Sequence, residues 1–310
     1  MDLHLGLLRG GWRRLLFLLA AASLLALCAA IGEFQALRAE TEWRIVAFFL
    51  LLPISLALTF TCPRNGTPGV QAAGILLLAL VARLALFPHP VDSNVYRYLW
   101  EGRLVREGYD PYMHIAAAPE WAGLHDAYWQ GMNQKDLRTI YPPLAEWIFA
   151  AAGGVCYHPM ALKAMIVAFD LGSIALLLAM LSSRSQPLRF AVFYAFNPIP
   201  LIGFGAEAHF DSLLIFFIVL ALWLRERRCA AWSWAALGLA VQIKLVAVLL
   251  IPLFSRQGGW RKAWAGAFVA AVPFLPYCPD VGTWLVGVLH FGVASRLQWI
   301  GSFPSLASIR

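Results

Sequence analysis

The sequence predicts an all-α, polytopic integral membrane helical bundle, and both its composition and the layout of its apolar residues support this fold class. Hydrophobic residues make up 61% of the 310 residues and charged residues 13%, with a mean hydropathy of +0.68. In lipid, only helices and closed barrels satisfy every backbone hydrogen bond. The apolar runs are continuous, whereas barrel strands alternate apolar and polar residues. We therefore expect a single helical transmembrane domain over residues 1–310.

The predicted membrane segments differ in length. A span needs about 20 apolar residues, because a helix rises about 1.5 Å per residue through a hydrocarbon core about 30 Å thick. In chain order, the apolar segments are 15–31, 45–60, 70–87, 144–155, 161–181, 190–204, 212–224, 230–254, 263–275 and 281–293. Segment 144–155 is too short to span and follows Pro142 and Pro143, which indicates a half-helix or re-entrant segment. We expect roughly nine or ten membrane segments, including short or re-entrant ones.

Basic residues indicate the orientation of the chain. They gather before the first apolar segment and in the linkers 184–189, 225–228 and 256–262. Cytoplasmic loops carry such an excess of arginine and lysine, so we expect these linkers inside the cell. Both ends of segment 230–254 then lie inside the cell, so this segment must bend near Lys244 and form two short limbs. Segment 88–141 and the turn 207–211 then lie outside. We expect a multi-pass protein of the bacterial inner membrane with its active site on the extracytoplasmic side.

Several functional classes lack support in the sequence. The net charge of +7 is not accompanied by a basic run interleaved with aromatic residues, so we expect no nucleic-acid partner. The five cysteines include no CxxC pair, which argues against a zinc site or a disulfide framework. No GxGxxG, Walker A, HExxH or GxSxG pattern is present, so we expect no cofactor. The basic N-terminus also fits a signal peptide, although no small-x-small cleavage site follows.

Segment 88–141 is expected to be an extracytoplasmic loop that carries the chemistry. Its first part is rich in ionisable side chains, namely Asp92, Arg97, Glu101, Arg103, Arg106, Glu107 and Asp110. Tyr96, Trp100 and Leu104 recur at helical spacing, which predicts an amphipathic juxtamembrane helix on the membrane surface. Residues 116–139 are polar and are expected to form a loop. Ionisable side chains at the edge of a bilayer are candidates for function.

Asp92 has two interpretations. It follows Pro88 and Pro90, on a turn that faces away from the bilayer, where a carboxylate can accept a proton from an attacking hydroxyl. Alternatively, Asp92 only caps the helix that begins after it, as aspartate commonly does. Its position in the sequence alone favours capping.

Cations near this segment are candidates to bind phosphate. Arg97 and Arg103 carry guanidinium groups, which bind phosphate in a bidentate way, although interfacial arginines also bind headgroups without further function. Lys244 lies deep in an apolar segment, where it needs an anionic partner such as a lipid phosphate. A simple pair with Asp170 or Glu207 is the alternative for Lys244. Lys163 and Asp170, seven residues apart, can also satisfy each other.

Two further groups of residues are candidates for the outer side. Glu207, His209 and Asp211 stand at alternate positions and could bind a metal only if the chain were extended, since on a helix they would face different ways. We therefore expect no metal site, and assign these residues to hydrogen bonding with substrate. Tyr141 and the prolines after it mark the re-entry of the chain into the membrane, where proline suits the start of a helix.

Five stretches, taken in order, resemble a known family of membrane enzymes. They are Asp92-x-x-x-Tyr96-Arg97-Tyr98-x-Trp100-Glu101-Gly102-Arg103 with Gly108-Tyr109-Asp110-Pro111-Tyr112; Ile140-Tyr141-Pro142-Pro143-Leu144; Asn197-Pro198; Gly205 with His209-x-Asp211; and Ala240-x-x-x-Lys244. The order over residues 87–254 is similar to that of the glycosyltransferases of GT-C fold that use a polyprenol-phosphate sugar. The mannosyltransferase branch gives the best match.

The resemblance implies a GT-C-like membrane enzyme that moves a sugar, expected to be mannose, from a polyprenyl-phosphate donor to a hydroxyl acceptor with inversion. The partners would be a lipid-linked sugar donor, a glycan or glycolipid acceptor, and the lipid bilayer. By the same resemblance Asp92 would be the general base. The donor phosphate would be held by Arg97, Arg103 and Lys244, and the sugar or acceptor site would be lined by Tyr141, His209 and Asp211.

The sequence departs from the family pattern at two places. Ser93 and Asn94 follow Asp92, where the family usually has an acidic residue. The sequence given stops at Arg310, where relatives generally continue, so a short member, a truncated gene and a fragment all stay open. The alternative functions are a non-catalytic lipid-phosphate-binding or flippase-like transport protein, and a scaffold built on the same fold.

Overall fold

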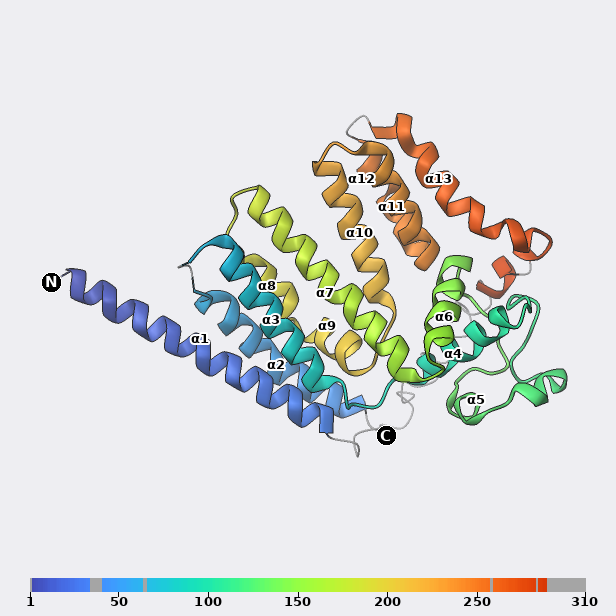
Figure 1. Cartoon of the computed structure of the whole chain (residues 1–310), viewed down its shortest axis with the longest axis horizontal. Helices are drawn as coiled ribbons and strands as arrows, with labels where there is room; N and C mark the ends of the chain where they lie inside the picture. The colour runs from blue at the N-terminus through green and yellow to red at the C-terminus, as the bar shows by residue number, and fades with distance from the viewer. Residues whose placement is uncertain (1, 34–40, 64–65, 257–258, 283, 289–310) are drawn as a thin grey trace, which may run out of the picture.

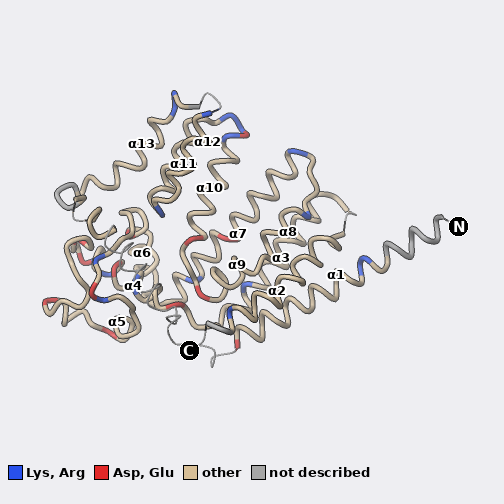
Figure 2. The backbone as a smooth tube through the Cα atoms, turned by 180° about the vertical axis from the view of Figure 1, so that it is seen from behind, with Lys and Arg blue, Asp and Glu red and all other residues tan. Residues whose placement is uncertain are grey.

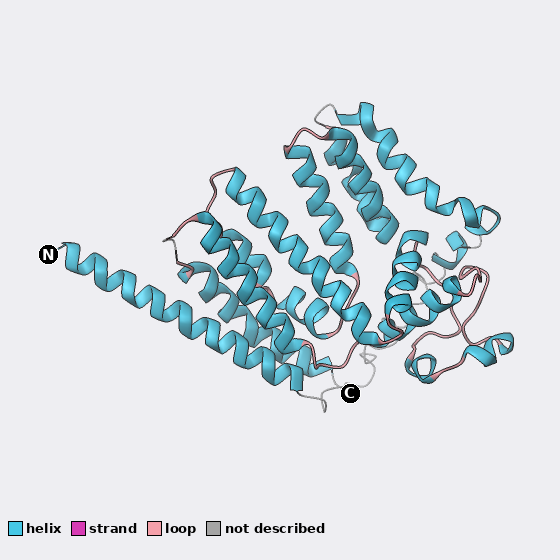
Figure 3. Cartoon of the chain, in the orientation of Figure 1, coloured by secondary structure: helices cyan, strands magenta, loops and turns pink. Residues whose placement is uncertain are grey.

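The chain folds entirely as helices and loops within the described residues. The computed structural model describes residues 2–33, 41–63, 66–256, 259–282 and 284–288, and no strand occurs among them (Figure 3). The helices are α1 (Asp2–Glu33), α2 (Thr41–Thr61), α3 (Pro68–Leu86), α4 (Ser93–Arg106), η2 (Pro119–Leu124), α5 (Ala127–Gly131), α6 (Pro143–Val155), α7 (Pro159–Ser183), α8 (Arg189–Ala195), α9 (Pro198–Pro200), η3 (Leu201–Ala206), α10 (Asp211–Glu226), α11 (Ala230–Ile243), η4 (Leu245–Leu250), α12 (Ile251–Ser255), η5 (Gly259–Lys262), α13 (Ala263–Ala271) and η6 (Val272–Asp280). The predicted all-α fold is confirmed.

Among the described residues, four helical stretches are long and apolar enough to cross a membrane. They are Gly11–Glu33, Trp43–Thr61, Pro68–Leu86 and Pro159–Ser183. These stretches belong to α1, α2, α3 and α7, which lie side by side with α8 in Figure 1. They enclose an apolar core in which side chains such as Leu51 are completely buried. This arrangement confirms a polytopic membrane bundle. Residues 283 and 289–293 of the segment predicted over 281–293 lie outside the described residues.

A second group of helices lies on the far side of α7: α10 packs against α7, α11 packs against α10, and α13 packs against α11 (Figure 1). A Cβ on Gly238 of α11 would lie only 2.5 Å from the carbonyl oxygen of Gly266 on α13, so these helices approach closely because both positions are glycine. Helix α11 ends at Ile243, and Lys244 is extended with φ −154° and ψ 126° before η4 begins. The predicted bend near Lys244, with two short limbs, is confirmed.

The apolar segment predicted over 190–204 is broken rather than continuous. Helix α8 ends at Ala195, and the Asn197 side chain accepts a hydrogen bond from the Ile199 N–H as the next helix begins. Pro198 and Pro200 lack N–H donors, so an α-helix cannot run unchanged through them. The chain continues as the short π-helix η3, which brings residues 207–211 to the end of the bundle where α4 lies.

Helix α4 differs from the predicted surface helix, because most of its length is covered by protein. Its buried residues are Val95, Arg97, Tyr98, Leu99, Trp100, Glu101, Gly102 and Leu104. On one face, a Cβ at Gly102 would lie 2.6 Å from the carbonyl carbon of Phe149, so α6 packs directly on the α4 backbone. On the other face, Trp100 packs with Trp121 and Met132 from the segment that follows α4. This segment, expected as a loop, contains η2 and α5 and folds over α4.

The two ends of the bundle carry different charges. Lysine and arginine mark the loop after α7, the loop between α10 and α11, and the start of α13, all at one end of the molecule (Figure 2). Acidic residues concentrate at the opposite end, around α4, α5 and α6 (Figure 2). The basic linkers that the sequence places on one side of the membrane therefore do lie together.

Candidate functional site

A polar pocket of about 360 Å³ opens at the end of the bundle where α2 begins, α3 ends and α4 begins. It is lined by Trp43, Arg44, His89, Pro90, Val91, Asp92, Ser93, Tyr96 and Glu207. A larger cavity of about 590 Å³ lies at the opposite end, between the loops that follow α2 and α7. Its described lining contains no carboxylate or histidine. The smaller pocket, which holds Asp92, is therefore the candidate site.

The turn that carries Asp92 is held by polar contacts on both sides. Lys163 of α7 points its Nζ at the end of α3 and donates to the backbone oxygens of Leu86, Phe87 and His89 at 3.2, 2.9 and 2.7 Å. The Asp92 N–H donates to the Glu207 carbonyl oxygen at 2.9 Å. Lys163 is thus fully engaged at this turn, and the proposed pairing with Asp170 is wrong.

Asp92 is the N-cap of α4. Its Oδ1 accepts from the Asn94 N–H at 2.9 Å and from the Asn94 Nδ2 at 2.7 Å. Its Oδ2 faces Arg44, with 3.6 Å to the Nη2 of that residue. The capping interpretation is therefore confirmed, but capping uses one oxygen and leaves the second toward the pocket. A role of Asp92 as a base stays a prediction that this geometry allows.

Arg44 is a residue that sequence reasoning missed. It lies in the first turn of α2, and its Nε is 2.5 Å from Glu207 Oε1, an ion pair without hydrogen-bond alignment. The Arg44 side chain is 46% exposed, whereas that of Glu207 is 7% exposed. Trp43 and Arg44 at the start of an apolar run are typical of an interfacial anchor, so nothing in the sequence signals a site there.

Two further ionic contacts continue from the pocket. Glu207 Oε2 contacts His209 Nε2 at 3.1 Å, and Asp211 Oδ1 accepts from Lys244 Nζ at 2.6 Å. Burial lowers the pKa of His209, but the hydrogen bond to Glu207 and the charges of Asp92 and Asp211 outweigh burial and raise the pKa above its ordinary value. The structure thus brings Asp92, His209, Asp211 and Lys244 to one end of the bundle. The pairings of Lys244 with Asp170 or Glu207 are wrong.

The Tyr141 ring lies at the same end of the bundle, where it packs against other aromatic rings. Its ring centroid lies 5.4 Å from that of Tyr98 and 5.2 Å from that of Phe210, next to Asp211 in the chain. Burial first, and then Tyr141 and Asp211, raise the pKa of Tyr98 well above its ordinary value. Tyr141 therefore forms the apolar wall between α4 and the 207–211 turn.

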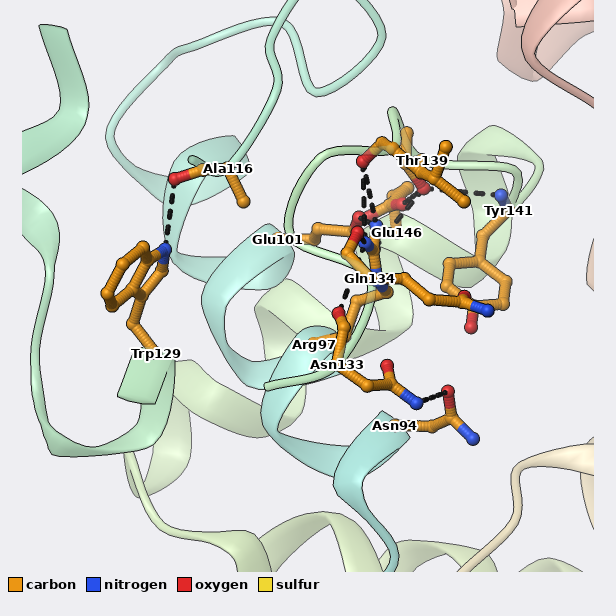
Figure 4. Close-up of polar contacts among 11 residues, drawn as sticks. Asn94, Arg97, Glu101, Ala116, Trp129, Asn133, Gln134, Thr139, Tyr141 and Glu146 are labelled. Atoms are coloured by element: carbon orange, nitrogen blue, oxygen red, sulfur yellow. Dashed lines mark hydrogen bonds and ion pairs between the residues drawn. The ribbon is translucent and has the colours of Figure 1, made fainter. Parts of the chain in front are cut away.

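Arg97 does not line the pocket and instead lies in a buried polar network (Figure 4). Its side chain is 5% exposed, and its Nη1 donates to Glu101 Oε1 at 2.7 Å. Its Nη2 donates to the Gln134 carbonyl oxygen and lies 3.4 Å from that of Leu137. These contacts join α4 to residues 107–142, the segment that follows it and covers it. Among the other predicted site residues, Arg97 interacts with Tyr141, but it does not line the pocket that holds Asp92.

The same network contains two carboxyl groups around one hydroxyl. Thr139 Oγ1 lies 3.2 Å from Glu101 Oε2 and 2.6 Å from Glu146 Oε1, and both glutamates are buried (Figure 4). A threonine hydroxyl has one hydrogen to donate, so the second contact requires a proton on a carboxyl group. Burial raises the pKa of Glu101, and the guanidinium of Arg97 opposes that shift without cancelling it. Glu101 and Glu146 are therefore expected to share one proton.

Arg103 also lies outside the pocket. Its Nε donates to Glu107 Oε1 at 2.7 Å and its Nη1 lies 3.4 Å from Asp126 Oδ2. Its guanidinium carbon is 5.9 Å from the ring centroid of Tyr157. The structure therefore separates Arg103 from the residues around Asp92. Within the described ranges, no group of three or more His, Cys, Asp or Glu side chains is arranged to hold a metal ion.

Comparison with known proteins places the chain in a family. The family model described as "Alpha-(1->6)-mannopyranosyltransferase, N-terminal domain" matches residues 20–257. Alpha-(1->6)-mannopyranosyltransferase A of Corynebacterium glutamicum is 24% identical over 186 residues, which cover 57% of this chain and 36% of that protein. The chain thus spans about a third of the length of this relative. No solved structure matches the chain. Because the family model covers well over half of the sequence, the chain belongs to the alpha-(1->6)-mannopyranosyltransferase family.

Proposed function

We propose that this chain transfers a mannosyl group from a polyprenyl-phosphate donor to a hydroxyl group of a glycan or glycolipid acceptor. The family and the named relative support the mannosyl group and an α-(1→6) linkage in the product. An α-(1→6) linkage makes the primary hydroxyl of an acceptor sugar the nucleophile. The observation that carries the proposal is Asp92 Oδ2, which is unused by the helix cap and faces a polar pocket.

The proposed reaction is a single displacement with inversion. The acceptor oxygen attacks the anomeric carbon of the donor while the bond from that carbon to the phosphate oxygen breaks. The phosphate leaves with the bonding electron pair, and the proton of the acceptor hydroxyl passes to Asp92 Oδ2. Inversion of a β-linked donor gives the α product that the family name specifies. A positioned base of this kind contributes about 10²- to 10⁴-fold to the rate.

The leaving phosphate needs a cation, and the pocket suggests which residues supply it. Arg44 is exposed, lies against Asp92, and presents a guanidinium suited to a phosphate. Lys244 is 49% exposed and contacts Asp211. We assign the donor phosphate to Arg44 and Lys244, in place of the predicted pair Arg97 and Arg103, which have other partners. His209 and Asp211 then line the sugar site.

The proposed site faces away from the cytoplasm. The basic loops lie at the end of the bundle opposite to α4, whose N-cap is Asp92, and an excess of arginine and lysine is typical of cytoplasmic loops. A polyprenyl phosphate has its charged group at the membrane surface, at the level where α2 and α3 meet the pocket. Donor and acceptor would therefore meet on the extracytoplasmic side.

Asp92→Asn tests the proposal. Asparagine caps helices as well as aspartate does, so this variant keeps the cap of α4 and removes only the base. We expect transfer of labelled mannose from the lipid donor in membranes to fall about 10²-fold or more, with unchanged expression and melting temperature. Asp136→Asn, at an exposed aspartate of the segment above α4, is the matched control and should transfer at the wild-type rate.

Two outcomes would contradict the proposal. Transfer by Asp92→Asn at the wild-type rate would remove Asp92 from the role of base. Movement of the lipid phosphate across the bilayer without any mannosylated product, in the wild type, would instead favour the lipid-transport function.

A further inference from the structure

The two oxygens of the Asp92 carboxylate have different surroundings. Oδ1 accepts two hydrogen bonds, from the backbone N–H and from the side-chain Nδ2 of Asn94. Oδ2 has the Arg44 guanidinium at 3.6 Å and otherwise faces the pocket. A helix cap needs only the first of these hydrogen bonds, because capping satisfies a backbone N–H. The second, from the amide side chain, therefore needs another explanation.

We propose that Asn94 is a positioning residue that holds Asp92 with one oxygen occupied and the other directed at the acceptor. This inference rests on the proposed role of Asp92 as the base. An N–H donated to a carboxylate favours its charged form and restricts its rotation. Asn94 does not enter the reaction itself.

The other end of the Asn94 amide contacts a second asparagine. Asn94 Oδ1 accepts from Asn133 Nδ2 at 3.3 Å, which leaves the Asn94 Nδ2 for Asp92 (Figure 4). The two ends of an amide are told apart only by their hydrogen-bond partners. Here a carboxylate lies at one end and a donor at the other, and both favour the same orientation.

Asn133 is held in turn by the buried network around Arg97. Its carbonyl oxygen lies 3.5 Å from Arg97 Nη2, which also donates to the next carbonyl along, that of Gln134. Arg97 is fixed by its ion pair with Glu101. A continuous path therefore runs from Asp92 through Asn94 and Asn133 to the core beneath the covering segment. Arg97 acts on the site through this path, without contact to the donor.

The test compares substitutions that change one hydrogen bond at a time. Asn94→Asp has the same shape but replaces the donor with a second carboxylate, Asn94→Ala removes the donor, and Asn94→Ser restores a hydroxyl that can donate. All three variants retain the backbone N–H of residue 94, which donates to Asp92 in the helix cap. We expect kcat to fall about tenfold to a hundredfold in Asn94→Asp, less in Asn94→Ala and least in Asn94→Ser, with the donor KM nearly unchanged.

The pH dependence separates positioning from a structural role. The acidic limb of the pH–rate profile should move to higher pH in Asn94→Asp, because a neighbouring negative charge favours protonation of the base. Asn133→Asp should move it in the same direction by less, because it would draw the Asn94 amide donor away from Asp92. Gln130→Glu, the same chemical change at an exposed site of the same segment, is the control and should leave the profile unchanged.

The inference would be overturned by an Asn94→Asp profile that coincides with the wild type, or by equal kcat values for Asn94→Ala and Asn94→Ser. If Asn94→Asp does not fold, as judged by its melting temperature, the comparison of alanine with serine still decides. An inactive Asp92→Asn combined with a wild-type Asn94→Asp would refute this inference alone. A fully active Asp92→Asn would refute the proposed function as well.

Discussion

Two arginine–carboxylate pairs join distant parts of the chain, and they differ in burial and in their position in the bundle. Arg83 on α3 contacts Asp170 on α7 at 2.7 Å, and both side chains are completely buried. Arg44 on α2 contacts Glu207 at 2.5 Å and Asp92 at 3.6 Å, with nearly half of the arginine exposed. The first pair lies inside the membrane-spanning helices, whereas the second lies at their end.

The partners of each pair explain the difference. Arg83 also donates to the Ala195 carbonyl oxygen at 2.6 Å, and Asp170 also accepts from the Tyr194 hydroxyl at 2.9 Å, so the pair joins α3, α7 and α8. Arg44 has only carboxylates as its described ionic partners and a pocket in front of it. A charge within the membrane is therefore not by itself a sign of function. The useful sign is an exposed charge whose partners a substrate can replace.

Arg83→Met gives the largest effect expected from this comparison. Removal of one member of a buried pair leaves the other charge without compensation, which costs about 3–5 kcal/mol. We expect a clear drop in melting temperature and in yield of detergent-solubilised protein. Arg83→Met combined with Asp170→Asn should recover part of the loss. A melting temperature equal to the wild type would show that the pair does not hold α3 and α7 together.

Arg44→Met should act mainly on activity. Glu207 is buried but keeps its contact with His209, and the Arg44 side chain is nearly half exposed, so the melting temperature should fall less than in Arg83→Met. Loss of a group that stabilises the leaving phosphate should lower kcat about 10²-fold. Arg44→Lys, which keeps the charge without the fork of donors, should retain intermediate activity. Transfer at the wild-type rate by Arg44→Met would assign the donor phosphate to other residues.

Part of the fold and of the candidate site could be predicted from the sequence alone. The short helix that ends at Val155 and the break at Lys244 follow from local chemistry, namely prolines and a charge in an apolar run. These expectations are confirmed. The cluster around residues 207–211 was also found, because a polar stretch between apolar segments stands out.

What the sequence could not supply are contacts between distant segments. Arg44 and Glu207 meet only because α2 and the end of η3 reach the same end of the bundle. Arg97 has the sequence signature of a phosphate ligand, yet the segment around Gln134 folds over it and supplies its partners. Helix α4 shows apolar residues at the spacing of a surface helix, but α6 and that same segment cover it. Periodicity reports which face is apolar and not what covers it.

Glu101→Gln gives the smallest expected effect and tests the buried network beneath the site. Because the pKa of Glu101 is raised in the folded protein from its ordinary 4.5, the folded state binds a proton that the unfolded chain has released. Stability is therefore greatest below that ordinary value and falls as the pH rises through the raised pKa, by at most about 1.4 kcal/mol per pH unit for one proton. Glutamine has no proton to lose, so melting temperatures of the variant across this pH range should fall less steeply. If the melting temperature of Glu101→Gln changed with pH as steeply as that of the wild type, Glu101 would not hold the proton shared around Thr139. Titration of Glu101 would then have no effect on the path from Arg97 to Asp92.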